Sequence, residues 1–142
     1  MLKKPFNQVF NNAKEVADRI IAEPNTSKYG RLSILSNWKL NVKKIMDIKP
    51  QSFSPRPKID STLLLFTPRE NYFELKNAKT LEMITRVFFS QRRKMLKKPF
   101  NQIFNNTKEI SEKFNIDLNL RPQNLEPEMY FNLAKEYENL RS

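Results

Sequence analysis

The residues best suited to chemistry are five cations in one short stretch of the chain. Within seven positions, with no carboxylate between them, the sequence has Arg92, Arg93, Lys94, Lys97 and Lys98. Guanidinium and ammonium groups gathered in this way can hold phosphate. The same pattern is typical of a solvated helix end, where lysines cover apolar neighbours and complement the helix dipole. The stretch alone leaves both interpretations open, and the composition of the chain favours phosphate binding.

The composition narrows the possible classes of site. The 142 residues include 26 Lys and Arg against 15 Asp and Glu, a formal net charge of +11, which favours nucleic acid or an anionic surface as partner. Without histidine or cysteine, neither a catalytic triad nor a familiar zinc site is expected, so no catalytic residue and no metal ligand is assigned. Gly30 is the single glycine, which excludes a glycine-rich cofactor loop, and no cofactor-binding residue is assigned.

The sequence shows no membrane span and no secretory signal, so a cytoplasmic location is expected. No apolar run approaches the roughly 18 residues that a membrane span needs, so no membrane partner is expected. The amino terminus is polar where a secretory signal would be apolar. The absence of cysteine agrees with a reducing compartment.

The basic stretch needs elements that position it. Apolar residues at three- and four-residue steps predict one long helix over 79–98 that stops at Pro99. Further helices are expected at 13–23, 34–38, 73–79, 100–105, 107–114 and 126–140. Two strands, at 40–48 and 59–68, flank a proline-rich loop and are expected to pair antiparallel. The continuous apolar run of the second strand predicts burial on both of its faces.

One segment of the sequence occurs twice. Residues 1–16 and 95–110 are identical at thirteen of sixteen positions. Two similar helices packed in similar grooves would account for the repeat. We prefer a duplication or rearrangement, in which residues 1–13 are a copy of 95–107 placed in a new context.

Four motifs occur in a characteristic order: KEVADRI at 14–20, YGRLS at 29–33, FSPRPKIDS at 53–61 and FSQRRKML at 89–96. Together they resemble the small-subunit rRNA adenine dimethyltransferases, the kasugamycin-resistance enzymes. That family transfers methyl groups from S-adenosylmethionine to N6 of two adjacent adenosines of 16S rRNA during ribosome biogenesis. The RPQNL segment at 121–125 also resembles the carboxyl end of the family.

The resemblance implies an α+β fold with three parts. Residues 1–13 are the duplicated segment, and residues 14–68 are the carboxyl-terminal edge of the catalytic domain. This edge is a remnant of a Rossmann-like methyltransferase sheet, an antiparallel hairpin plus helices. Residues 69–142 are an all-helical domain that docks on rRNA. The truncated sheet is expected to have an unpaired edge at 62–66.

The resemblance also assigns functional residues. The implied RNA-binding residues are the five cations together with Arg31 and Lys58, which would lie nearer the active-site edge. Tyr29 could stack on a base, although packing beside Gly30 is favoured. Phe88 and Phe89 are interpreted as core residues, and Asp60 as a cap or ion-pair member rather than a catalytic acid.

What the chain lacks determines its expected activity. The family's glycine-rich cofactor loop, its acidic residue for the cofactor ribose and its Asn-Leu-Pro-Tyr motif are not found in this sequence. The full-length family uses S-adenosylmethionine, but this chain alone is expected to bind no cofactor and to be inactive. The expected partners are small-subunit rRNA or the 30S precursor, and a separately encoded amino-terminal half. A non-catalytic module that binds RNA or the ribosome, and a rearranged gene relic without function, remain as alternatives.

Overall fold

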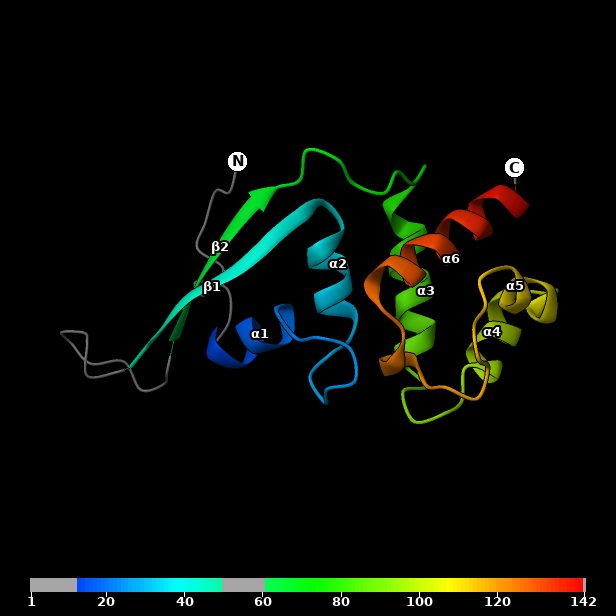
Figure 1. Ribbon diagram of the computed structural model, residues 1–142, viewed down its shortest axis with the longest axis horizontal. Helices are drawn as coiled ribbons and strands as arrows, with labels where there is room; N and C mark the ends of the chain where they lie inside the picture. Colours follow the sequence, from blue (N-terminus) through cyan, green and yellow to red (C-terminus); the bar gives the residue numbers. More distant parts are fainter. Residues whose placement is uncertain (1–12, 50–60, 142) are drawn as a thin grey trace.

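The computed structural model describes residues 13–49 and 61–141, which form two antiparallel strands and a set of helices (Figure 1). The predicted duplicated segment, Lys58 and Asp60 lie outside these residues. The elements in chain order are the helices α1 (Ala13–Ile20) and α2 (Arg31–Lys39), the strands β1 (Leu40–Ile48) and β2 (Ser61–Pro68), the helices α3 (Ala78–Phe89), α4 (Lys97–Ile103) and α5 (Thr107–Lys113), the 3-10 turn η3 (Pro122–Asn124) and the helix α6 (Pro127–Leu140).

Strands β1 and β2 form the predicted antiparallel hairpin, paired from Leu40 with Pro68 to Ile48 with Ser61. A bulge interrupts the register between Lys44 and Met46. In the described part of the chain the sheet has these two strands alone, so no strand lies beside β2 on its other side there. The hairpin extends away from the helices α3 to α6, as Figure 1 shows.

The expectation that β2 is buried on both faces is wrong. Thr62 is 7% exposed, but Leu63 and Leu65 are 45% and 48% exposed. Helix α1 packs against β2 and covers one face. Alternate side chains of a strand point to opposite faces, so the leucines on the other face remain open to solvent. Met46, which pairs with Leu63, is also 52% exposed.

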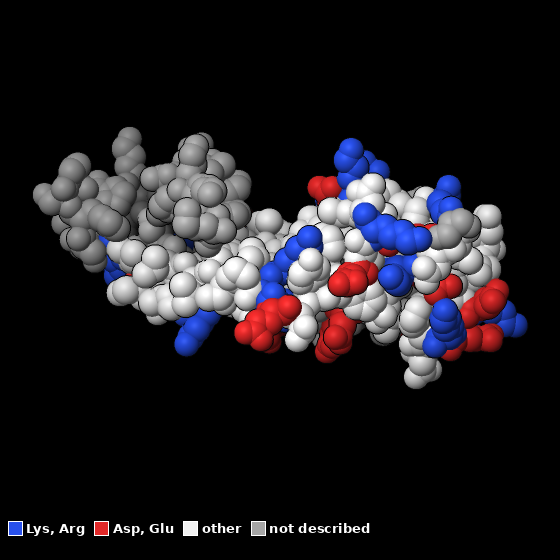
Figure 2. Space-filling model, turned by 90° about the horizontal axis from the view of Figure 1, so that it is seen from above, with Lys and Arg blue, Asp and Glu red and all other residues white. Residues whose placement is uncertain are grey.

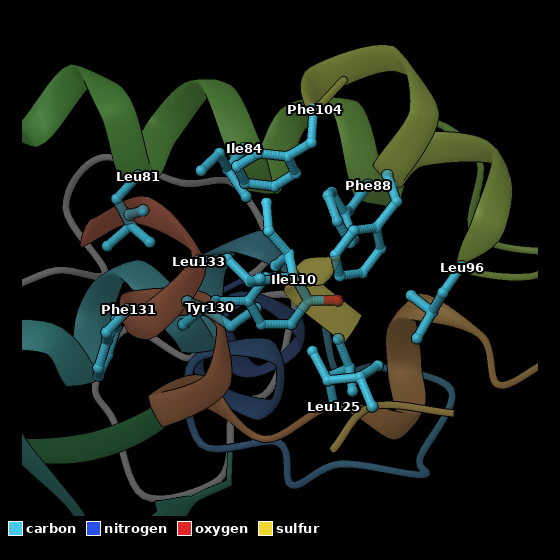
Figure 3. Close-up of a cluster of buried hydrophobic side chains, with 14 of the residues drawn as sticks. Leu81, Ile84, Phe88, Leu96, Phe104, Ile110, Leu125, Tyr130, Phe131 and Leu133 are labelled. Atoms are coloured by element: carbon cyan, nitrogen blue, oxygen red, sulfur yellow. The ribbon is translucent and has the colours of Figure 1, made fainter. Parts of the chain in front are cut away.

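Helix α3 lies at the centre of the hydrophobic core. Leu81, Ile84 and Phe88 are fully buried at three- and four-residue spacing, which places them on one helical face. The Phe88 ring meets Tyr130 of α6 edge-on at a centroid distance of 5.5 Å and Phe100 of α4 at 5.4 Å. Figure 3 shows Ile84 and Phe88 of α3 together with Tyr130 of α6 in this cluster.

The core continues across the predicted boundary at residue 69. Tyr29, Ile34 and Trp38 precede that boundary in sequence and belong to the same buried cluster as Phe88 and Tyr130. The Trp38 indole N–H also donates to the carbonyl of Phe73, at 2.5 Å. The helix α2 is therefore packed as part of the helical body, and the division at 68/69 stays a prediction.

The predicted helix over 79–98 is wrong in its second half. Helix α3 ends at Phe89, and a turn leads to α4, which begins at Lys97 and contains Pro99 in its first turn. The backbone N–H of Leu96 donates to Leu120 at 2.7 Å, and that of Lys97 to Leu118 at 3.3 Å. Proline is tolerated there because the first N–H groups of a helix have no intrahelical acceptor. Met95, expected on the apolar face, is 53% exposed, whereas Leu96 is fully buried.

The other helix expectations mostly hold. Helices α1, α2, α5 and α6 lie within or beside the predicted ranges, and Glu126 precedes Pro127 at the start of α6 as expected. The short helix expected at 73–79 is wrong, because the chain is not helical until Ala78. No helix in the described ranges is long and apolar enough to cross a bilayer.

The start of α3 is held by a carboxylate from α6. Glu138, 8% exposed, accepts hydrogen bonds from the backbone N–H groups of Lys76 at 2.8 Å and Asn77 at 2.9 Å. Asn77 in turn caps α3 by accepting from the N–H of Lys79. Burial raises the pKa of the Glu138 carboxyl, but the hydrogen bonds to its charged form outweigh burial, and the net pKa is lowered.

We therefore expect Glu138→Gln to destabilise the fold in a pH-dependent way. Because the folded-state pKa is depressed, the contribution of the charge is present above the ordinary value of 4.5 and is lost as the pH falls through the folded pKa. The substitution should cost about 1–2 kcal/mol at pH 7. Urea unfolding of both proteins at pH 7 and pH 3.5 should show the difference shrinking at the lower pH. An equal difference at both pH values would contradict this account.

Candidate nucleic-acid interface

Four exposed cations occupy the turn between α3 and the first residues of α4. We call this set the basic turn; its members are Arg93, Lys94, Lys97 and Lys98. None of the ion pairs in the described part of the chain involves any of them. Their positive charges are therefore available to an external anion. Leu96 is buried between them, so the apolar anchor of the turn points inward while the cations point outward.

Arg92, the fifth cation of the stretch, has a different environment. Its guanidinium donates to the carbonyls of Tyr29, Thr26 and Ser27, the last two at 3.1 and 2.7 Å. It also lies over the Phe89 ring, 5.7 Å from the centroid. Gly30 adjoins this contact, since an added Cβ there would lie 3.5 Å from the Arg92 guanidinium. The Arg92 guanidinium thus makes three hydrogen bonds within the protein, and its place among the RNA-binding residues stays a prediction.

Arg121 adds a cation that the sequence reasoning did not assign to the interface. It is exposed, and its Nε donates to the backbone carbonyl of Arg93 at 3.1 Å. Residue 121 reaches the basic turn because the segment before η3 pairs with residues 96 and 97. The only signal in the sequence was the resemblance of RPQNL to the carboxyl end of the family.

Arg31 lies apart from the basic turn. It is half-buried at the start of α2, and its guanidinium donates to the Thr85 hydroxyl at 3.4 Å and to the Glu82 carbonyl at 3.2 Å. The structure therefore brings Arg31 to the middle of α3 rather than to its end. Lys58, the remaining predicted residue, lies outside the described residues.

Two buried tyrosines support the backbone behind the interface. The Tyr29 hydroxyl donates to the carbonyl of Leu125, and the Tyr130 hydroxyl to that of Pro122, each at 2.6 Å. Burial, with a smaller effect of Glu126, raises the pKa of Tyr29 well above its ordinary value, and burial likewise raises the pKa of Tyr130. Both phenols therefore stay protonated and donate. Tyr29 is fully buried, so packing rather than base stacking is its role, and Phe88 is a core residue as expected.

The positive charge is not uniform over the surface. Figure 2 shows one face on which Lys and Arg side chains alternate with Asp and Glu over the helical part. The surface between that part and the undescribed residues is mostly uncharged in the same view. Among the described residues, no group of three or more Asp or Glu is arranged to hold a metal ion.

Curated relatives match most of the chain. A "Ribosomal RNA small subunit methyltransferase A" from Pelagibacter ubique (strain HTCC1062) is 80% identical over 128 residues, which cover 90% of this chain and 49% of the relative. A protein of the same name from Wolbachia sp. subsp. Drosophila simulans (strain wRi) is 44% identical over 125 residues, covering 88% of this chain and 46% of the relative. The chain thus spans about half the length of the curated relatives that it matches.

Two solved structures share the fold. A dimethyladenosine transferase from Plasmodium falciparum superposes with a TM-score of 0.76 at 25% identity, over 89% of this chain and 55% of that one. The 23S rRNA methyltransferase ErmE, at 16% identity, superposes with a TM-score of 0.58 over 87% of this chain and 51% of that one and supports the fold alone. The α+β fold is therefore that of part of a Rossmann-like methyltransferase followed by helices.

The family model for ribosomal RNA adenine dimethylase matches residues 7–139. Together with the relatives, this match shows that the chain belongs to the ribosomal RNA adenine dimethylase family. The resemblance inferred from the four motifs is confirmed.

The different environments of Arg92 and Arg93 lead to different expected effects on stability. Arg92→Ala removes hydrogen bonds from a charged donor to three carbonyls, so it should cost about 2–3 kcal/mol of unfolding free energy. Arg93→Ala removes an exposed side chain and should change stability by no more than about 0.5 kcal/mol. Chemical denaturation of the two variants measures both values. Equal stability of the two variants would contradict the structural role of Arg92.

Proposed function

We propose that this chain is the rRNA-docking portion of an S-adenosylmethionine-dependent rRNA adenine N6,N6-dimethyltransferase and is inactive by itself. It would hold small-subunit rRNA or the 30S precursor through backbone phosphates. The observation that carries the proposal is the basic turn, four exposed cations outside any described ion pair, in a member of an rRNA-modifying family. Phosphate contacts of this kind set position and orientation without reading bases.

The arrangement of the turn supports docking on RNA in two ways. The backbone of the turn is held from behind through Leu96 and Lys97, so the cations project from a fixed frame. Arg121 extends the positive surface beside Arg93. Long exposed cations on a fixed backbone lose less conformational freedom on binding than cations on a loose tail. Residues 69–142 would then act as the docking domain, and residues 14–68 would supply the edge of the catalytic domain.

Calorimetry tests the docking and the inactivity together. A small-subunit rRNA fragment should bind the chain more weakly as salt rises, whereas S-adenosylmethionine alone should give no heat of binding. In a variant with Arg93, Lys94, Lys97 and Lys98 all changed to Gln, the slope of log K against log salt should fall by roughly 0.7–0.9 for each phosphate that the variant no longer neutralises.

A matched control makes this test specific. Four glutamines at Lys43, Lys49, Lys108 and Lys135 remove the same charge from other parts of the chain, and this variant should retain most of the salt slope. An equal fall of the slope in both variants would show a general charge effect and contradict docking through the basic turn. Binding of S-adenosylmethionine by the chain alone would contradict the proposed inactivity. A folded chain that binds neither rRNA nor S-adenosylmethionine would favour the gene relic. A chain that binds RNA but gives no methyl transfer when it is mixed with a separate amino-terminal half would favour the non-catalytic module.

We further propose a separately encoded amino-terminal half as partner, docking on the hairpin. The chain spans about half of its curated relatives, and the hairpin exposes Leu63, Leu65 and Met46 on one face. Exposed apolar side chains clustered on a sheet are typical of an interaction surface. A polypeptide that carries the family's glycine-rich loop and Asn-Leu-Pro-Tyr motif would cover this face and complete the sheet.

Mixing the chain with such a polypeptide, built from the Pelagibacter ubique relative, should restore methyl transfer from S-adenosylmethionine to small-subunit rRNA. Leu63→Lys combined with Leu65→Lys should abolish both the complex and the activity. The control Leu140→Lys changes an equally exposed leucine of α6 and should leave both intact. Absence of a complex with the unaltered chain in analytical ultracentrifugation would contradict the proposed partner.

A further inference from the structure

A second group of cations lies along α3, away from the basic turn. Arg31, Lys79 and Arg86 line an open hollow of about 400 Å³ together with Glu82 and Met83. Lys79, Met83 and Arg86 follow one another at four- and three-residue spacing, so they share the face of α3 opposite its buried residues. Lys79 and Arg86 are about 10 Å apart along the helix axis, given a rise of about 1.5 Å per residue.

One side chain of the hollow is held in place by hydrogen bonds, and the hollow has more cations than carboxylates. Arg31 is held across it by hydrogen bonds from its guanidinium to the Thr85 hydroxyl and the Glu82 carbonyl, and Thr85 itself is fully buried. Glu82 contributes one carboxylate against three cations. In the described part of the chain, none of these four charged side chains takes part in an ion pair. The cations are therefore not neutralised within the protein.

Helix stability does not explain two of the three cations. Arg31 is the first residue of α2 and Lys79 the second residue of α3, and neither helix has an acidic residue in its first turn. The helix dipole disfavours positive charge at these positions. Arg86 lies in the last turn of α3, where a cation is favourable. An external anion would offset the unfavourable placement of Arg31 and Lys79.

We propose that this hollow is a second phosphate-binding site, which takes backbone phosphates of the docked RNA. The proposal rests on the rRNA docking argued above and extends it from the end of α3 to its side. RNA backbone is the ligand that fits, because the hollow is open and no aromatic ring is among the described residues that line it, so a base has nothing to stack on. A guanidinium held at its place can present its remaining donors to a phosphate without further loss of freedom.

The salt dependence of RNA binding tests this site. Lys79→Gln with Arg86→Gln removes the two exposed cations, and the slope of log K against log salt for a small-subunit rRNA fragment should fall by roughly 1.4–1.8, the value for two contacts. Lys43→Gln with Lys108→Gln removes the same charge from β1 and α5 and should change the slope by much less. Circular dichroism melting should show that both double variants remain folded, since all four side chains are exposed.

The possible outcomes separate this site from the basic turn. If the unaltered chain binds the RNA and the Lys79/Arg86 variant retains the slope of the control, the second site is overturned while docking through the basic turn stands. If the unaltered chain does not bind the RNA, both proposals are overturned. A slope lowered in the Lys79/Arg86 variant, and lowered further when the basic turn is also changed, is the result that we expect.

Discussion

The hydrogen bonds of Arg92 and Tyr29 hold together distant parts of the described chain. Arg92, just beyond α3, donates to three carbonyls of the segment that precedes α2, including that of Tyr29. The Tyr29 hydroxyl crosses the core to the carbonyl of Leu125, ahead of α6. Tyr29 thus accepts a hydrogen bond from the middle of the chain through its carbonyl and donates one to the carboxyl-terminal part through its hydroxyl. Because the Tyr29 hydroxyl is sheltered from water, its bond is worth more than the same bond on the surface.

The cationic surfaces depend on this arrangement. Glu138 fixes where α3 begins, and the pairing of residues 96 and 97 with 118–120 fixes the path that follows it. Helix α3, between these points, is followed by the basic turn at one end and has the hollow of Arg31, Lys79 and Arg86 along its side. Its opposite face is occupied by the apolar core, so its polar side is turned to solvent. A helix held at both ends is a suitable scaffold for phosphate contacts, whose value depends on fixed spacing.

Unlike α3, whose apolar face is buried, the hairpin has paired strands but leaves the apolar side chains of one face exposed. Its exposed leucines contribute less to the stability of this chain than buried leucines would, because they retain much of their contact with water. In a chain that spans about half of its relatives, such a face is consistent with a surface that a larger protein would bury. Under the function proposed above, docking and methyl transfer reside in different parts of the full-length relatives.

Local patterns in the sequence were sufficient for the family, the α+β class, the antiparallel hairpin and most of the helices. Each of these depends on residue types a few positions apart, such as the apolar spacing in α3 or Pro127 after Glu126. Tertiary contacts decided the rest. The break at Phe89 follows from hydrogen bonds between residues 96–97 and 118–120, and the carbonyl contacts of Arg92 span more than sixty positions of sequence. The sequence by itself determined that this chain has many cations close together; only the tertiary structure decided which of them face solvent, because that depends on partners distant in the sequence.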